Sequence, residues 1–146
     1  MASLAWNGHR LRLSSLGREN QPWEVLAWIA RHARTGPAMV AIDAPTIVRN
    51  PTGRREAEAL LTRDFARYHA GVYPSNLGRP FAARTTGFAR ALARRGFLHA
   101  DRIATRTPGR YQIEVYPHSA AIRLFDLPGI GSVGAEDGRV SGSVNC

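Results

Sequence analysis

The 146-residue sequence contains no lysine and only one cysteine, Cys146, which is its last residue. A single cysteine cannot form a disulfide within the chain, and this fits a reducing cytoplasm. No apolar run approaches the length of a membrane span. The first residues, MASLAW, lack the basic region and long apolar stretch of a signal peptide. These features predict a cytoplasmic protein with no membrane partner.

Several catalytic motifs are also missing from the sequence. There is no glycine-rich phosphate loop and no serine or cysteine nucleophile motif, and the histidines lack the spacing of a zinc site. Acidic residues are scarce, because 11 acids stand against 20 basic residues, giving a formal net charge of +9. Every basic residue is arginine, which grips phosphate with two parallel N–H donors. The surplus predicts a nucleic-acid partner, with a purely electrostatic, ribosome-like role as the alternative.

The length predicts one domain, residues 1–128, and 44% hydrophobic residues are enough for a packed core. Residues 4–16 are expected to form a β-hairpin, with Asn7-Gly8 as a two-residue turn. Helices are expected from about residue 21 to 34, from 52 to 69, from 80 to 95, and from Ser119 onward. Residues 129–146 are rich in glycine and serine without helical periodicity, so this tail is expected to be disordered.

The apolar run from Ala38 to Ala44, closed by Pro45, predicts a strand buried on both faces in a parallel sheet. Asp43 lies at its carboxyl end, where open α/β sheets place their ligands. A second strand is expected over residues 111–117, with Glu114 near its carboxyl end. Neighbouring strands lie about 4.8 Å apart, so these carboxylates could share Mg²⁺ or Mn²⁺. The alternative is that both are ordinary polar residues at strand ends.

His118 adjoins the end of this second strand. Its side chain could orient a water, contact phosphate or cap the following helix. The loop after Asp43 leaves the sheet on the same side as Asp43 itself, so Arg49, Arg54 and Arg55 are expected nearby. These belong to a run with 13 arginines and four acids between residues 49 and 110. The alternative is that this run of charged residues forms only a solvent-exposed face.

Three segments of the sequence resemble the domain of unknown function 429 family, described as predicted nucleases with an RNase H-like fold. They are VAIDAPTIVRNPTGRREAE, FARYHAGVYPSNLGRPFAARTTGFARAL and GRYQIEVYPHSAAIRLFDLP. The resemblance covers roughly residues 23–128 and implies an α/β fold, an RNase H-like mixed sheet flanked by helices. It also implies a site in which acidic side chains on adjacent strand ends hold two metal ions, and these ions promote hydrolysis of a phosphodiester.

The resemblance further implies roles for individual residues. Asp43 and Glu114 would be metal ligands, and His118 would be an auxiliary catalytic group. Arg54 or Arg55, together with Glu58, would be the loop and helix residues nearest the site. From the helical spacing of the apolar residues alone, Glu58 is expected on a solvent-exposed flank of its helix.

The sequence departs from the family pattern at both ends. Family members begin with a strand carrying Gly-x-Asp, whereas this chain opens at ASLAWNGHRLRL, which resembles their second strand. Beyond Leu127-Pro128 the family's further helices and their additional acid are replaced by the glycine- and serine-rich tail. The first strand and the C-terminal helices are therefore expected to be missing. The resulting unpaired sheet edges favour a homodimer.

Three functional hypotheses follow from these observations. The first is a metal-dependent nuclease-like phosphodiesterase, or an incomplete fragment of one. The second is a non-catalytic basic protein that binds nucleic acid through its arginines. The third is an enzyme that acts on a small phosphorylated molecule. The sequence does not distinguish DNA from RNA as the polymer.

Overall fold

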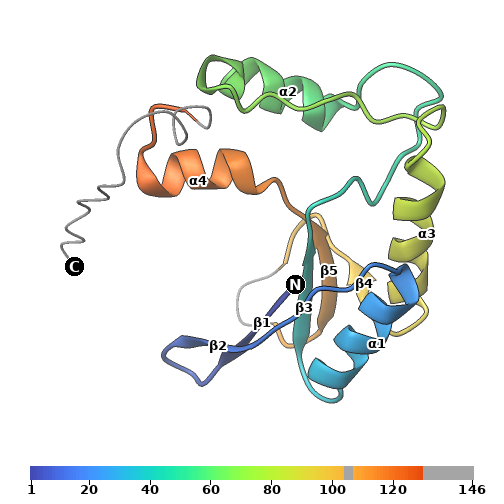
Figure 1. Ribbon diagram of the computed structural model, residues 1–146, viewed down its shortest axis with the longest axis vertical. Coiled ribbons are helices and arrows are strands. Elements are labelled where there is room, and N and C mark those ends of the chain that lie inside the picture. Colours follow the sequence, from blue (N-terminus) through green and yellow to red (C-terminus); the bar gives the residue numbers. More distant parts are fainter. Residues whose placement is uncertain (104–106, 130–146) are drawn as a thin grey trace. The chain divides into compact units, whose positions relative to one another are not determined.

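The computed structural model describes residues 1–103 and 107–129, and its chain divides into two compact units (Figure 1). The first unit comprises Met1–Ile47 and Ala83–Glu114, and the second comprises Val48–Ala82 and the residues from Val115 onward. Apart from Gly129, the tail expected to be disordered lies outside the described residues. Across the described ranges, no helix is both long enough and apolar enough to cross a bilayer.

The first unit begins with the expected hairpin, formed by β1 (Ala2–Trp6) and the antiparallel strand β2 (Leu11–Leu16). The strand pairing ends at Trp6 and Leu11, and the Asn7 backbone N–H donates to Arg10 O at 3.3 Å, so the turn has Gly8 and His9 at its tip, one residue later than the predicted Asn7-Gly8. The Asn7 side chain supports the turn, because its Oδ1 accepts a hydrogen bond from the backbone N–H of Arg10 at 2.9 Å. The hairpin exposes most of its apolar side chains, namely Leu4, Trp6, Leu11, Leu13 and Leu16.

A separate three-stranded parallel sheet contains both predicted acid-bearing strands. Its order is β3 (Ala38–Ile42), β5 (Arg110–Glu114), β4 (Leu98–His99). The α/β class and the parallel pairing of β3 with β5 are therefore confirmed. Strand β4 was not predicted from the sequence. The hairpin forms its own two-stranded sheet instead of joining a single mixed sheet, which leaves β3 at an edge in the described part of the chain.

Helices α1 (Pro22–His32) and α3 (Ala82–Ala93) pack against one face of the three-stranded sheet (Figure 1). The core consists of buried side chains from these helices and the segment after α3, with Val40 and Ile42 of β3 against it: Leu26, Trp28, Ile29, Leu92 and Phe97. Met39, on the other face of β3, is 59% exposed. Within the first unit, β3 is therefore buried on one face and not on both as predicted, because α1 and α3 pack on the same face.

The second unit contains α2 (Glu56–Phe65), the 3-10 turn η1 (Ala66–Tyr68) and α4 (Pro117–Phe125). The predicted helix at residue 52 begins four residues later, at Glu56. The helix expected from Ser119 begins two residues earlier, at Pro117, whose fixed φ suits a first helical position. Both differences concern helix starts, where several side chains can serve as caps.

Candidate functional site

The two strand-end carboxylates lie on neighbouring strands of one sheet. In the parallel register of β3 and β5, Ile42 lies opposite Glu114, and Asp43 is the next residue after Ile42. Asp43 and Glu114 are both exposed, and the chain bends at Asp43 and Ala44 as it leaves β3. Asp43 and Glu114 therefore lie at the carboxyl ends of adjacent strands, with Glu114 paired to Ile42 and not to Asp43. The expectation that their strands are neighbours is confirmed.

Glu114 is held by a threonine that follows β3. Its Oε2 accepts a hydrogen bond from the Thr46 backbone N–H at 3.0 Å and from the Thr46 hydroxyl at 3.4 Å. The Thr46 Oγ1 also lies 3.0 Å from Nε2 of His99, the last residue of β4. The tautomer of the His99 imidazole sets which of the two groups donates in this hydrogen bond. This chain of hydrogen bonds orients the Glu114 carboxylate.

Thr46 and His99 were not identified from the sequence. Thr46 is 4% exposed, although it sits in a loop that the sequence gives no reason to bury. His99 reaches it because β4 pairs in parallel with β5, placing His99 opposite Gln112. The sequence signal for β4 is only the dipeptide Leu98-His99, shortly after Gly96. A dipeptide is too short to indicate a strand.

A valine at position 46 tests this support for Glu114. Thr46→Val keeps the shape and the backbone N–H but removes the hydroxyl that links Glu114 to His99. We expect a loss of about 1 kcal/mol in the free energy of unfolding, the usual net value of one hydrogen bond. Urea unfolding followed by tryptophan fluorescence measures it, with Thr46→Ser as the control expected to remain near the original stability. Equal stabilities of the valine variant and the original chain would contradict the assignment.

The candidate metal ligands at the carboxyl ends of these strands are two carboxylates, Asp43 and Glu114. Carboxylate oxygens are the preferred ligands of Mg²⁺, which retains several waters and often takes only one or two carboxylates from the protein. Among residues 1–103 and 107–129, no group of three or more His, Cys, Asp or Glu side chains is placed to hold a metal. Metal binding by Asp43 and Glu114 therefore stays a prediction.

The other predicted site residues belong to the second unit. His118 lies in the first turn of α4, and its ring centroid is 5.3 Å from that of Tyr116. Arg49 and Arg54 are exposed. The structure does not place these residues relative to Asp43 and Glu114, so their auxiliary and substrate-binding roles stay predictions.

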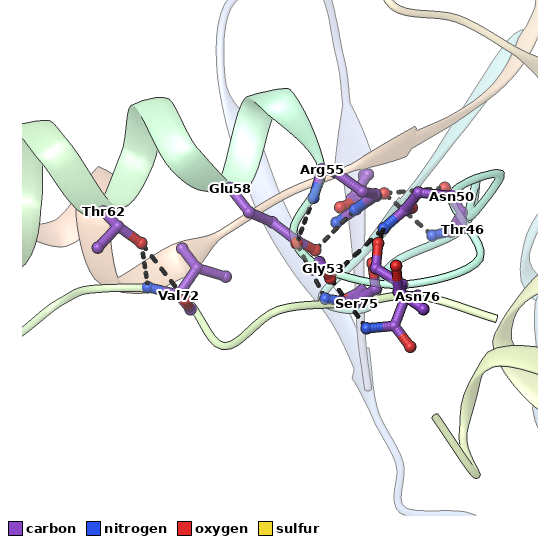
Figure 2. Close-up of polar contacts among 11 residues, drawn as sticks. Thr46, Asn50, Gly53, Arg55, Glu58, Thr62, Val72, Ser75 and Asn76 are labelled. Carbon is purple, nitrogen blue, oxygen red and sulfur yellow. Dashed lines mark hydrogen bonds and ion pairs between the residues drawn. The ribbon is translucent and has the colours of Figure 1, made fainter. Parts of the chain in front are cut away.

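Arg55 and Glu58 form an ion pair at the start of α2 (Figure 2). The Arg55 Nε donates to Glu58 Oε1 at 2.7 Å, and the Arg55 backbone N–H donates to Oε2 at 3.0 Å. The Ser75 backbone N–H adds a third hydrogen bond, to Oε2 at 2.9 Å. Glu58 is only 1% exposed, so its expected position on a solvent-exposed flank was wrong. These partners outweigh the preference of an isolated carboxylate for water.

The environment of Glu58 lowers its pKa. Burial alone would raise the pKa of this carboxyl, but hydrogen bonds from Ser75 and Arg55 favour the charged form and more than offset that effect. The surrounding loops are fixed in the same network, since Asn50 Nδ2 donates to Ser75 O at 3.0 Å and Asn76 Nδ2 donates to Gly53 O at 2.9 Å (Figure 2). Glu58 therefore acts as a structural anchor for the segments on either side of α2.

Comparison with protein-family models identifies the family of this chain. Residues 1–141 match the family model described as "Protein of unknown function (DUF429)". The chain belongs to the DUF429 family. This confirms the resemblance seen in the sequence, and the match covers the hairpin as well as the three quoted segments. Neither the curated proteins nor the solved structures contain a match to the chain. The description of the DUF429 family assigns no activity, so function has to be argued from the site.

Proposed function

We propose that this DUF429 protein is a divalent-cation-dependent phosphodiesterase that acts on nucleic acid. The observation that supports it most is the pair of carboxylates on adjacent parallel strands, with Glu114 oriented by Thr46. Two exposed carboxylates at one sheet edge repel each other, and a cation between them removes that repulsion. Two carboxylates that hold a divalent cation at the ends of adjacent strands can present that cation to a phosphodiester.

Each residue of the edge has a separate task in this proposal. Asp43 and Glu114 bind Mg²⁺ or Mn²⁺, and Thr46 with His99 keeps the Glu114 carboxylate in position. A bound divalent ion would supply charge neutralisation at the phosphate and a metal-bound water that is more acidic than bulk water. Arg49 and Arg54, which are exposed on the second unit, contact phosphates of the bound nucleic acid, and His118 keeps its predicted auxiliary role. The proposal includes no role for Arg55 and Glu58 beyond organising the loop that precedes α2.

The excess positive charge favours a polymer over a small substrate. The chain has a formal net charge of +9, and 13 of its 20 arginines fall between residues 49 and 110. A field of this strength attracts polyanions and raises their association rates. The competing functions are nucleic-acid binding without catalysis and hydrolysis of a small phosphorylated molecule. A homodimer formed through the open edges of the sheets also stays a prediction.

One experiment distinguishes these functions. End-labelled single- and double-stranded DNA and RNA, and separately a nucleoside monophosphate, are incubated with the full chain in Mg²⁺, in Mn²⁺ and in EDTA. The proposal expects polymer cleavage that requires the metal. Retention of the polymers without cleavage would support the binding protein, and release of phosphate from the monophosphate alone would support the small-molecule enzyme.

Binding to nucleic acid is expected to weaken steeply with salt. If about four phosphates are neutralised, affinity should fall about 100-fold between about 50 and 200 mM salt, because bound counterions are released. Arg49→Gln and Arg54→Gln should each reduce the slope of log affinity against log salt by about one. Arg12→Gln, on the hairpin, is the matched loss of charge and should leave the slope unchanged. Fluorescence anisotropy in EDTA measures all of these, and a flat salt response would contradict a phosphate-binding surface.

A further inference from the structure

A pocket lies directly beside the carboxylate edge of the sheet. Its volume is about 260 Å³, and residues of the first unit line it from three directions. Ile42 and Ala44 come from the end of β3 on either side of Asp43, Pro22 and Val25 come from α1, and Phe88 comes from α3. Ile42 lies opposite Glu114 in the β3–β5 register, so the pocket opens at the end of the sheet that carries the candidate site.

The pocket combines apolar lining residues with one cationic and two amide side chains. The side chains from β3, α1 and α3 just named are apolar or aromatic. Arg84 and Thr85 of α3 line the pocket one turn before Phe88, and Asn20 and Gln21 line it just before α1. Arg84 is exposed, so its guanidinium is accessible to a ligand. A flat, partly polar ring would be matched by the apolar walls and by the amides, which can both donate and accept hydrogen bonds.

The size of the pocket restricts the ligand further. Pockets for drug-sized ligands start at about 300 Å³, so this pocket accommodates one ring system and little else. Proteins that read single-stranded nucleic acids bind unstacked bases on aromatic side chains and on arginine guanidinium planes, with amides at the base edge. A base in a duplex is stacked and paired and cannot enter such a pocket without being extruded.

We propose that this pocket binds one unstacked nucleobase of a single-stranded nucleic acid, next to the phosphodiester that meets Asp43 and Glu114. The inference rests on the proposed function in that the substrate is a nucleic acid, and it adds the strand state of that substrate. Arg84 provides the positively charged contact to the base or its phosphate, and the walls around Ala44 exclude water from the base. The preferred substrate is therefore single-stranded.

The test measures binding without metal, so that it does not depend on cleavage. A short single-stranded DNA and the same strand with one abasic position in its centre are titrated with the full chain in EDTA. The original chain should bind the intact strand about 10-fold more tightly, since stacking of one base contributes on that scale. A 2-aminopurine placed at the same position should change its fluorescence on binding.

Three variants assign the preference to the pocket. Ala44→Leu fills the pocket without changing charge, and Arg84→Gln removes the cation at its rim; both should bind the intact and abasic strands equally. Arg90→Gln is the matched control, because Arg90 lies on the same helix, is exposed and does not line the pocket. It should keep the 10-fold preference. Circular dichroism melts verify that each variant is folded.

Two results would overturn the inference. One is equal affinity of the original chain for the intact and abasic strands. The other is a preference that survives in Ala44→Leu. If no cleavage is found under any metal condition but the preference behaves as expected, the base pocket stands and the phosphodiesterase proposal fails. If cleavage is found and the preference for the intact strand is absent, the phosphodiesterase proposal stands and the base pocket fails.

Discussion

Replacing Asp43 by asparagine is expected to reduce metal-dependent cleavage of nucleic acid by at least about 100-fold, since losing even an outer-shell partner of a metal ligand costs up to that much. The substitution keeps the size of the side chain and removes its charge, so the sheet edge retains its shape while one ligand is lost. Glu114→Gln should have an effect of the same order. Gel analysis of labelled strands over a Mg²⁺ titration measures both.

The matched control for these variants is Glu19→Gln, which removes one carboxylate of the first unit. Glu19 lies before α1, with Oε1 4.0 Å from Arg31 Nη2, and has no part in the strand-end site. Its cleavage rate should equal that of the original chain. Activity that persists in both Asp43→Asn and Glu114→Gln would exclude the sheet edge as its source and would contradict the proposed function.

Glu58→Ala is expected to destabilise the protein by about 3 kcal/mol, the lower range for breaking a buried ion pair. The substitution removes the acceptor for the Arg55 side chain, the Arg55 N–H and the Ser75 N–H. The Arg55 guanidinium, only 17% exposed, would then lose its charged partner. Urea unfolding monitored by circular dichroism gives the loss. Glu56→Gln, an exposed acid in the same helix turn, should change the free energy of unfolding by only a few tenths of a kcal/mol.

The contribution of Glu58 should depend on pH in a defined direction. Because its pKa in the folded protein lies below the ordinary value of 4.5, the unfolded chain binds the proton more readily. The stabilisation is therefore complete above that value and is lost as the pH falls through the lower, folded pKa. The difference in unfolding free energy between the original chain and Glu58→Gln should shrink in acid. A difference that grows in acid would show that burial, rather than hydrogen bonding, controls the pKa.

The parts of the fold that could be predicted from the sequence are those fixed by local periodicity. The uninterrupted apolar run before Asp43 and the β-branched run before Glu114 each indicated a strand, and both strands are present and parallel. The hairpin and the four helices were also expected from turn residues and helical spacing. Their starts were less certain, since caps such as Gln21, Arg55 and Tyr116 compete with neighbouring polar residues.

The contacts that could not be predicted depend on tertiary packing. Trp23, in the first turn of α1, is 65% exposed, whereas Trp28 of the same helix is buried in the core. Glu58 was expected in solvent, yet the loop containing Ser75 folds over it. The link from His99 through Thr46 to Glu114 joins three segments that are far apart in the sequence. No local pattern specifies such a link.

Binding of Mn²⁺ to single and double variants tests the shared-ion site most directly. Electron paramagnetic resonance titrations would compare the original chain with Asp43→Asn, Glu114→Gln and the double variant. If both carboxylates hold one ion, each single change should nearly abolish binding at the site, and the double variant should be no worse than the weaker single variant. Independent, additive losses, or Mn²⁺ binding unchanged by all three variants, would contradict a cation held jointly by Asp43 and Glu114.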